Sequence, residues 1–149
     1  MVKILFICYG NICRSPMAEF IMKDLVESSG LGQDIYVESA ATSNEEIGND
    51  IYYKAESQLR KEKVPYSHRM ARRITEDDYK EFDYIIGMED NNVKDILRIV
   101  GEDSDNKVYK LLDFSDNPRD ISDPWYTRNF QKAFDDIKEG CEALLKSIT

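Results

Sequence analysis

Five residues separate a cysteine and an arginine near the amino terminus, Cys8 and Arg14. The thiolate of a cysteine is a nucleophile, and it forms more readily beside a helix N-terminus and a fixed cation. A guanidinium can bind two phosphoryl oxygens at once with its planar fork. The pair predicts phosphate-monoester chemistry, with Cys8 as the nucleophile and Arg14 binding the phosphoryl group. Because this spacing also occurs by chance, the surrounding residues decide the interpretation.

The residues around this pair predict a phosphate-binding loop. Residues 2–7 are almost wholly apolar, which is typical of a strand buried on both faces of a parallel sheet, and Cys8 follows them. Gly10 and Asn11 tolerate a positive φ, so the short loop can curl until successive amides point inward. Ser15, followed directly by proline, predicts a helix N-cap. Loop amides and a helix N-terminus should therefore converge on an oxyanion, and Ser15 could also donate a hydrogen bond to the Cys8 thiolate.

Composition limits the partners and the compartment of the protein. The 149 residues, 42% of them hydrophobic, predict one domain that spans 1–149. A net charge of −9 argues against nucleic acid or an anionic membrane as a partner, because the long-range field repels both. Three cysteines, no secretory leader and no run of about 18 apolar residues favour the cytoplasm.

Strands and helices are expected to alternate along the chain. Short apolar runs predict four strands, at 2–7, 35–40, 84–88 and 108–112, and helical periodicity appears between them and after the last. Strand, helix, strand units cross right-handed and give parallel pairs. The predicted fold class is therefore α/β: a single three-layer domain with a four-stranded parallel open sheet flanked by helices. Ligands of such sheets bind at the carboxyl ends of strands, where Cys8 lies.

An acidic loop over residues 113–124 should reach the same edge of the sheet, because it follows the fourth predicted strand. Cleavage of an aryl phosphate leaves a phenolate, and protonating that oxygen in the transition state contributes about 10²- to 10⁴-fold. A carboxylic acid near Cys8 is therefore expected. Composition does not choose among the four candidates, Asp113, Asp116, Asp120 and Asp123.

The stretch from Cys8 to Glu19 resembles the signature of the low-molecular-weight protein tyrosine phosphatases, Cys-x-Gly-Asn-Ile-Cys-Arg-Ser-Pro-x-Ala-Glu. Similar segments at 39–43, at 82–86 and at the Asp123-Pro pair extend the resemblance over nearly the whole chain. It implies hydrolysis of phosphotyrosine in proteins, and of aryl phosphates, through a phosphocysteine intermediate without metal or cofactor. Phosphate, vanadate and sulfate would be active-site anions. The resemblance selects Asp123 as general acid and then base, because the family places this acid before a proline and aromatic residues.

The resemblance also implies supporting roles. The phosphate-binding loop comprises Tyr9, Gly10, Asn11, Ile12, Cys13 and Ser15, and the expected substrate pocket comprises Tyr9, Ile12, Glu45, Trp125 and Tyr126. Asn11, Ser39 and His68 fall where family members support the loop by hydrogen bonding, although the stretch after His68 is one residue longer than usual. Many relatives carry an aromatic residue in place of Glu45. An acidic residue there would disfavour acidic peptides, unless Glu45 is simply an exposed loop charge.

Three alternatives differ in chemistry. An arsenate reductase with this loop would need further cysteines near the third strand, and residues 80–100 contain none. A protein arginine phosphatase of the same family would resemble this sequence except for threonine in place of Ile12. A non-catalytic phosphotyrosine-binding protein or phosphocysteine carrier needs the loop but no acid, so the presence of both Arg14 and Asp123 favours the enzyme.

The two other cysteines are expected to have different roles. Cys13 lies in the same loop as Cys8, which makes it a candidate redox partner that forms a disulfide with an oxidised Cys8. The alternative is that Cys13 packs beneath the loop. Cys141 falls on the apolar stripe of the last predicted helix, which indicates a place in the core.

Overall fold

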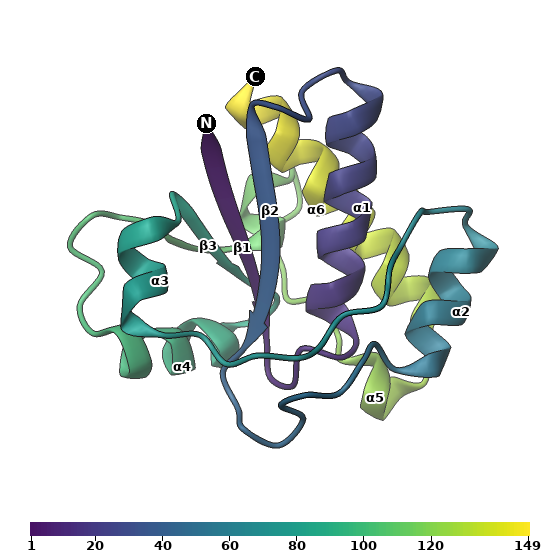
Figure 1. Ribbon diagram of the computed structural model, residues 1–149, viewed down its shortest axis with the longest axis horizontal. Coiled ribbons are helices and arrows are strands. Elements are labelled where there is room, and N and C mark those ends of the chain that lie inside the picture. The colour runs from purple at the N-terminus through teal and green to yellow at the C-terminus, as the bar shows by residue number, and fades with distance from the viewer.

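All four strands of the computed structural model, which describes residues 1–149, run parallel in one sheet (Figure 1). They are β1 (Val2–Cys8), β2 (Ile35–Ala41), β3 (Tyr84–Gly87) and β4 (Val108–Lys110), in the order β2-β1-β3-β4. The predicted α/β class with a four-stranded parallel sheet is confirmed. Because β1 has a neighbour on each side, Cys8 ends a central strand at the point where the strand order reverses, which is where such sheets bind ligands.

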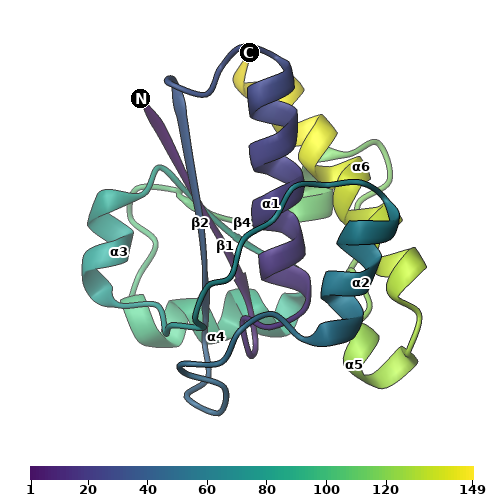
Figure 2. The same cartoon turned by 45° about the vertical axis from the view of Figure 1, so that its right-hand side comes forward.

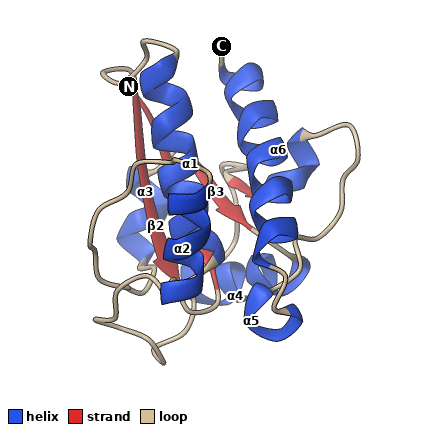
Figure 3. Cartoon of the chain, turned by 90° about the vertical axis from the view of Figure 1, so that its right-hand side faces the viewer, coloured by secondary structure: helices blue, strands red, loops and turns tan.

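Helices cover both faces of the sheet (Figure 2). On one face lie α1 (Arg14–Ser28), α2 (Tyr53–Lys61) and α6 (Phe130–Ile148), and on the other lie α3 (Glu76–Glu81) and α4 (Asp90–Val100). Figure 3 shows α1 and α6 side by side. The short helix α5 (Pro124–Thr127) precedes α6 near the carboxyl ends of the strands. None of these helices combines the length and apolar character needed to cross a membrane.

Side chains of β1 are buried on both faces of the sheet. Phe6 and Cys8 belong to the core formed with α1, α2 and α6, whereas Leu5 and Ile7 belong to the core on the α3 and α4 side. A strand buried on both faces needs apolar residues at successive positions rather than at alternate ones. This double burial explains the apolar run before Cys8. It also holds the start of the following loop in place, because β1 is packed on both faces.

The start of α1 differs from the prediction. The helix begins at Arg14, its N-cap is Cys13, and no side chain caps it, so Ser15 lies inside the first turn. The Ser15 hydroxyl is instead engaged by Cys8 and Asn11. A polar side chain that makes tertiary hydrogen bonds is not available to cap a helix. The start of α1 therefore lacks a capping side chain from its own N-cap, and the Ser15 amide instead donates to the Cys8 sulfur at 3.5 Å.

The fourth strand is also shorter than expected. It ends at Lys110, and the apolar residues that follow form a 3₁₀ helix, η1 (Leu111–Phe114), which packs against α6. Leu111 is fully buried there. Short apolar runs do not by themselves distinguish strand from helix.

Candidate active site

Hydrogen-bond donors surround the sulfur of Cys8. The backbone amides of Asn11 and Ser15 donate to its Sγ at 3.2 and 3.5 Å, and the Ser15 Oγ lies 3.0 Å from it. Cys8 is buried, so little water competes with these donors. The loop and the start of α1 therefore direct three polar groups at one sulfur, at the carboxyl end of β1.

Asn11 holds the loop in its curled shape. Its φ is 59°, in the left-handed region, and the residue is fully buried. The side-chain Nδ2 donates to the hydroxyls of Ser15, at 2.7 Å, and Ser39, at 2.9 Å. The Ser39 hydroxyl in turn donates to Glu19 at 2.6 Å. The structure thus brings Asn11 and Ser39 together beneath the loop, as the sequence predicts.

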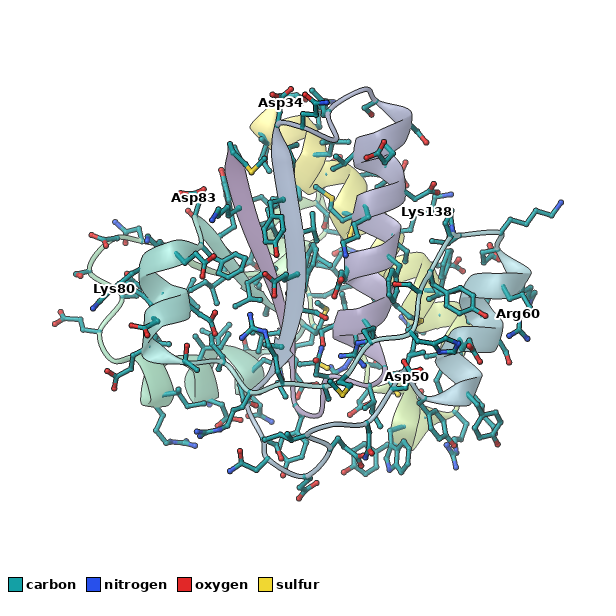
Figure 4. All side chains as sticks on the ribbon, in the orientation of Figure 1. Asp34, Asp50, Arg60, Lys80, Asp83 and Lys138 are labelled. Atoms are coloured by element: carbon teal, nitrogen blue, oxygen red, sulfur yellow. The ribbon has the colours of Figure 1, made fainter.

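The structure does not bring His68 to the loop, which corrects its predicted supporting role. The side chain of His68 is 82% exposed, and its Nδ1 lies 2.6 Å from Asp50 Oδ2; Figure 4 labels Asp50. Arg69 takes the expected place: its Nη2 donates to the backbone oxygen of Asn11 at 2.7 Å and also to the Asn11 side-chain oxygen. In an extended segment successive side chains point in opposite directions, so one extra residue exchanges the two positions.

Arg69 is the functional residue that sequence reasoning missed. The only signal was the stretch after His68, one residue longer than usual. Burial lowers the pKa of Arg69, while negative charge at Glu19 and Cys8 acts against this shift. A guanidinium stays protonated near neutrality even so. Arg69 therefore places a lasting positive charge beneath the phosphate-binding loop.

Arg14 is almost completely buried at the opposite side of the loop. Its Nη1 donates to Glu89 Oε2 at 2.5 Å and to the backbone oxygen of Ile121 at 2.8 Å, and its Nη2 lies 3.4 Å from Asp123 Oδ2. Burial acts to lower the pKa of Arg14, but negative charge on Cys8 and Asp123 and the bond to Glu89 outweigh it and raise the pKa. These contacts fix the guanidinium beside Cys8. Nothing in the sequence singled out Glu89.

A cavity of about 130 Å³ opens above Cys8. It is lined by Cys8, Tyr9, Gly10, Ile12, Cys13, Arg14, Glu45, Glu46, Asp123, Trp125 and Tyr126. The three residues predicted to be catalytic and the five predicted for the pocket all belong to this set. Asp123 caps α5, its Oδ1 accepting the amide of Trp125 at 3.0 Å. The cavity can accept a phosphoryl group at its base and an aromatic ring at its wall.

Cys13 and Cys141 are both buried free thiols. Cys13 lines the cavity, and burial together with negative charge on Cys8 raises the pKa of its thiol. Cys141 packs between α6 and α1, with its sulfur 3.9 Å from the backbone oxygen of Ala18. Cys141 is thus a core residue, in agreement with its predicted place on the apolar stripe.

The sequence model of the family described as "Low molecular weight phosphotyrosine protein phosphatase" matches residues 3–149. The chain belongs to this family. It is 39% identical over 150 residues to the low molecular weight protein-tyrosine-phosphatase YfkJ of Bacillus subtilis, covering 99% of this chain and 96% of the relative. It is 36% identical to the human low molecular weight phosphotyrosine protein phosphatase, covering 97% and 94%.

Solved structures agree with this assignment. The crystal structure of YfkJ matches with a TM-score of 0.95 at 39% identity, over 99% of this chain and 94% of that one. The Drosophila arginine phosphatase matches with a TM-score of 0.91 at 29% identity, over 99% and 98%. The protein is therefore a phosphatase of this family, as the sequence predicts.

Arg69→Ala and His68→Ala should behave differently. A hydrogen bond to a charged group contributes about 1.5–3 kcal/mol, so Arg69→Ala should lower the free energy of unfolding by about 2 kcal/mol and weaken competitive inhibition by phosphate. Arg69→Lys should recover part of both. His68→Ala removes an exposed side chain and should change stability by less than about 0.5 kcal/mol. Urea unfolding and phosphate inhibition constants measure this, and equal effects of the two alanine variants would contradict the assignment of loop support to Arg69.

Proposed function

We propose that this phosphatase hydrolyses phosphotyrosine in proteins through a phosphocysteine intermediate on Cys8. The observation that carries the proposal is the convergence of two loop amides and the Ser15 hydroxyl on the Cys8 sulfur, with Arg14 and Asp123 in the same cavity. Phosphate, vanadate and sulfate match the charge and size of such a site. A silent phosphotyrosine reader would need the loop but no carboxyl group beside it.

In the first step the Cys8 thiolate attacks phosphorus while the amides and Arg14 bind the phosphoryl oxygens. A sulfur–phosphorus bond forms, the ester oxygen–phosphorus bond breaks, and Asp123 donates its proton to the leaving phenolate oxygen. Asp123 lies 3.4 Å from Arg14, so a phosphoryl group bound by Arg14 would be close to the carboxyl group that donates the proton.

In the second step Asp123 acts as the base. It accepts a proton from water as that water attacks the phosphocysteine, which breaks the sulfur–phosphorus bond and releases phosphate. Cys8 leaves as the thiolate that began the reaction. A single carboxyl group thus serves both steps, because it is left deprotonated by the first.

The wall of the cavity supports an aryl substrate. Ile12, Trp125 and Tyr126 offer apolar and aromatic surface, and the Tyr9 hydroxyl is engaged by Glu45 at 2.9 Å. Aromatic side chains bury large apolar areas on a phenyl ring. Because one structural neighbour is named an arginine phosphatase, phosphoarginine is the second candidate substrate. Ile12, where that activity is expected to have threonine, favours phosphotyrosine.

The proposal also includes a cytoplasmic location and redox control of the enzyme. Free cysteines are typical of a reducing compartment, which supports a cytoplasmic location. Cys13 shares the loop and the cavity with Cys8, which supports redox control. Peroxide would oxidise the Cys8 thiolate to a sulfenic acid, and condensation with the Cys13 thiol would form a disulfide and release water.

The Cys8→Ser variant tests the proposed nucleophile. It should retain phosphate binding but hydrolyse phosphotyrosine peptides more than about 10⁴-fold more slowly, because serine stays protonated near neutrality. Phosphate-induced thermal stabilisation measures binding, and single-turnover assays measure the reaction. Vanadate should inhibit the unaltered enzyme. Substantial turnover by Cys8→Ser would contradict the assignment.

Asp123→Ala should affect substrates according to their leaving group. Phosphotyrosine hydrolysis should fall by about 10²- to 10⁴-fold, whereas an aryl phosphate with a strongly acidic phenol needs little protonation and should lose about tenfold or less. Rates measured over a series of aryl phosphates give this dependence. An equal loss for all leaving groups would indicate a structural role.

Cys13→Ser should make oxidation irreversible. After peroxide treatment the unaltered enzyme should regain activity with dithiothreitol, and mass spectrometry should detect a link between Cys8 and Cys13. Cys13→Ser has no resolving thiol, so Cys8 should proceed to sulfinic acid and recover little. Cys141→Ala removes a core thiol and should recover like the unaltered enzyme. Equal recovery of Cys13→Ser, with no link in the unaltered enzyme, would leave Cys13 a packing residue.

A further inference from the structure

The entrance to the active site has two hollows that share a wall. The cavity above Cys8 and a second groove of about 300 Å³ are both lined by Tyr9, Arg14, Asp123 and Tyr126. Two residues of this shared wall are exposed to solvent, Tyr9 at 46% and Tyr126 at 81%. The groove is therefore continuous with the cavity, and a peptide whose phosphotyrosine occupies the cavity can extend into it.

The groove runs along α4 and has one unpaired cation. Arg14 is engaged by Glu89 and Asp123, and Arg98 lies 2.8 Å from Asp95. Lys94 is exposed in the same groove and forms no ion pair with any carboxylate. Its ammonium group is free to bind a carboxylate of a substrate. Figure 1 shows α4 at the edge of the sheet where the strands end.

The segment after β2 places the opposite charge at the cavity. Glu45 and Glu46 both line it, and neither forms an ion pair. The Glu45 carboxylate accepts the Tyr9 hydroxyl, and Glu46 accepts the side-chain amide of Asn49 at 2.6 Å. The hydrogen-bond partner of each of these carboxylates is a neutral group. The cavity side of the entrance therefore has two carboxylates without a cationic partner, and the groove side has one cation without an anionic partner, Lys94, among charges that are otherwise paired.

We propose that this entrance selects phosphotyrosine segments that are themselves bipolar, with an acidic residue bound by Lys94 and a basic residue bound by Glu45 and Glu46. The inference rests on the proposed function and adds a substrate class to it. The net charge of −9 repels acidic peptide segments at long range. An acidic residue of a substrate can therefore bind only beside a local unpaired cation, and Lys94 is such a cation. Opposite charges on the two sides also fix the direction in which a peptide lies.

Two phosphotyrosine peptides of equal net charge and reversed polarity test the proposal. One has aspartate before and lysine after phosphotyrosine, and the other has the reverse order. Each exposed ion pair changes binding by about 1.5- to 5-fold, so the unaltered enzyme should favour one peptide by about two- to 25-fold in kcat/KM. Each value is divided by that for p-nitrophenyl phosphate with the same variant, which removes effects on the chemical step.

Lys94→Glu should reduce or reverse this preference, and Glu45→Lys should do the same from the other side. The matched control is Lys138→Glu, which makes the same charge change on an exposed position of α6, far from the entrance (Figure 4). It should keep the preference of the unaltered enzyme. Raising the salt concentration should weaken the preference, because exposed charges are screened.

The outcomes separate this inference from the proposed function. Equal kcat/KM for the two peptides, or the same ratio in Lys94→Glu and Lys138→Glu, would overturn the inference while hydrolysis of both peptides upholds the function. No hydrolysis of any phosphotyrosine peptide would contradict the function. In that case the inference would be tested by binding alone. Fluorescence anisotropy would give the affinities of the two peptides for Cys8→Ser, with and without Lys94→Glu or Lys138→Glu, and equal affinities would overturn the inference.

Discussion

The left-handed conformation of Asn11 is the constraint on which the site depends. Most residues other than glycine enter this region at a cost of about 1–2 kcal/mol and asparagine at a lower one, and at φ 59° hydrogen bonds to every polar group of its side chain hold Asn11 there. The partners come from separate elements: α1 supplies Ser15, β2 supplies Ser39, and the extended segment before α3 supplies Arg69. Without them the loop could open, and the amides would no longer point at the Cys8 sulfur.

The charged side chains around this loop are also held by partners from separate elements. Two guanidiniums contact the residues around Cys8, the buried one of Arg14 and the partly buried one of Arg69, in a protein whose net charge is −9. A buried cation without a partner would be costly, and each has one: Glu89 and Asp123 for Arg14, and the oxygens of Asn11 for Arg69. In the proposed function, this local positive charge would attract a phosphate dianion despite the overall repulsion. The same carboxylates that stabilise the cations also supply the proposed general acid.

The sheet makes this assembly possible because its parallel strands all end at one edge. Cys8 ends β1, Ser39 lies near the end of β2, and Glu89 follows β3; these residues are far apart in sequence, but their strands are neighbours. The acidic loop after η1 returns Asp123 to the same edge, where α5 begins. Double burial of β1 holds Cys8 in place, while longer loops form the wall of the cavity. A site placed on a rigid strand with a wall of loops suits the proposed function, because the strand fixes the reacting group and the loops contact the substrate.

Local spacing allowed the sequence by itself to predict Cys8 as the nucleophile, Arg14 beside it and the curled loop, and to determine the parallel α/β class. Resemblance, not composition, selected Asp123 among four aspartates. Tertiary structure alone decided which side chains complete the site. Arg69 rather than His68 supports the loop, because neighbours in an extended segment point in opposite directions and a shift of one residue exchanges them. Likewise, Glu89 reaches Arg14 only because β3 pairs with β1, and no local pattern encodes which strands will be neighbours.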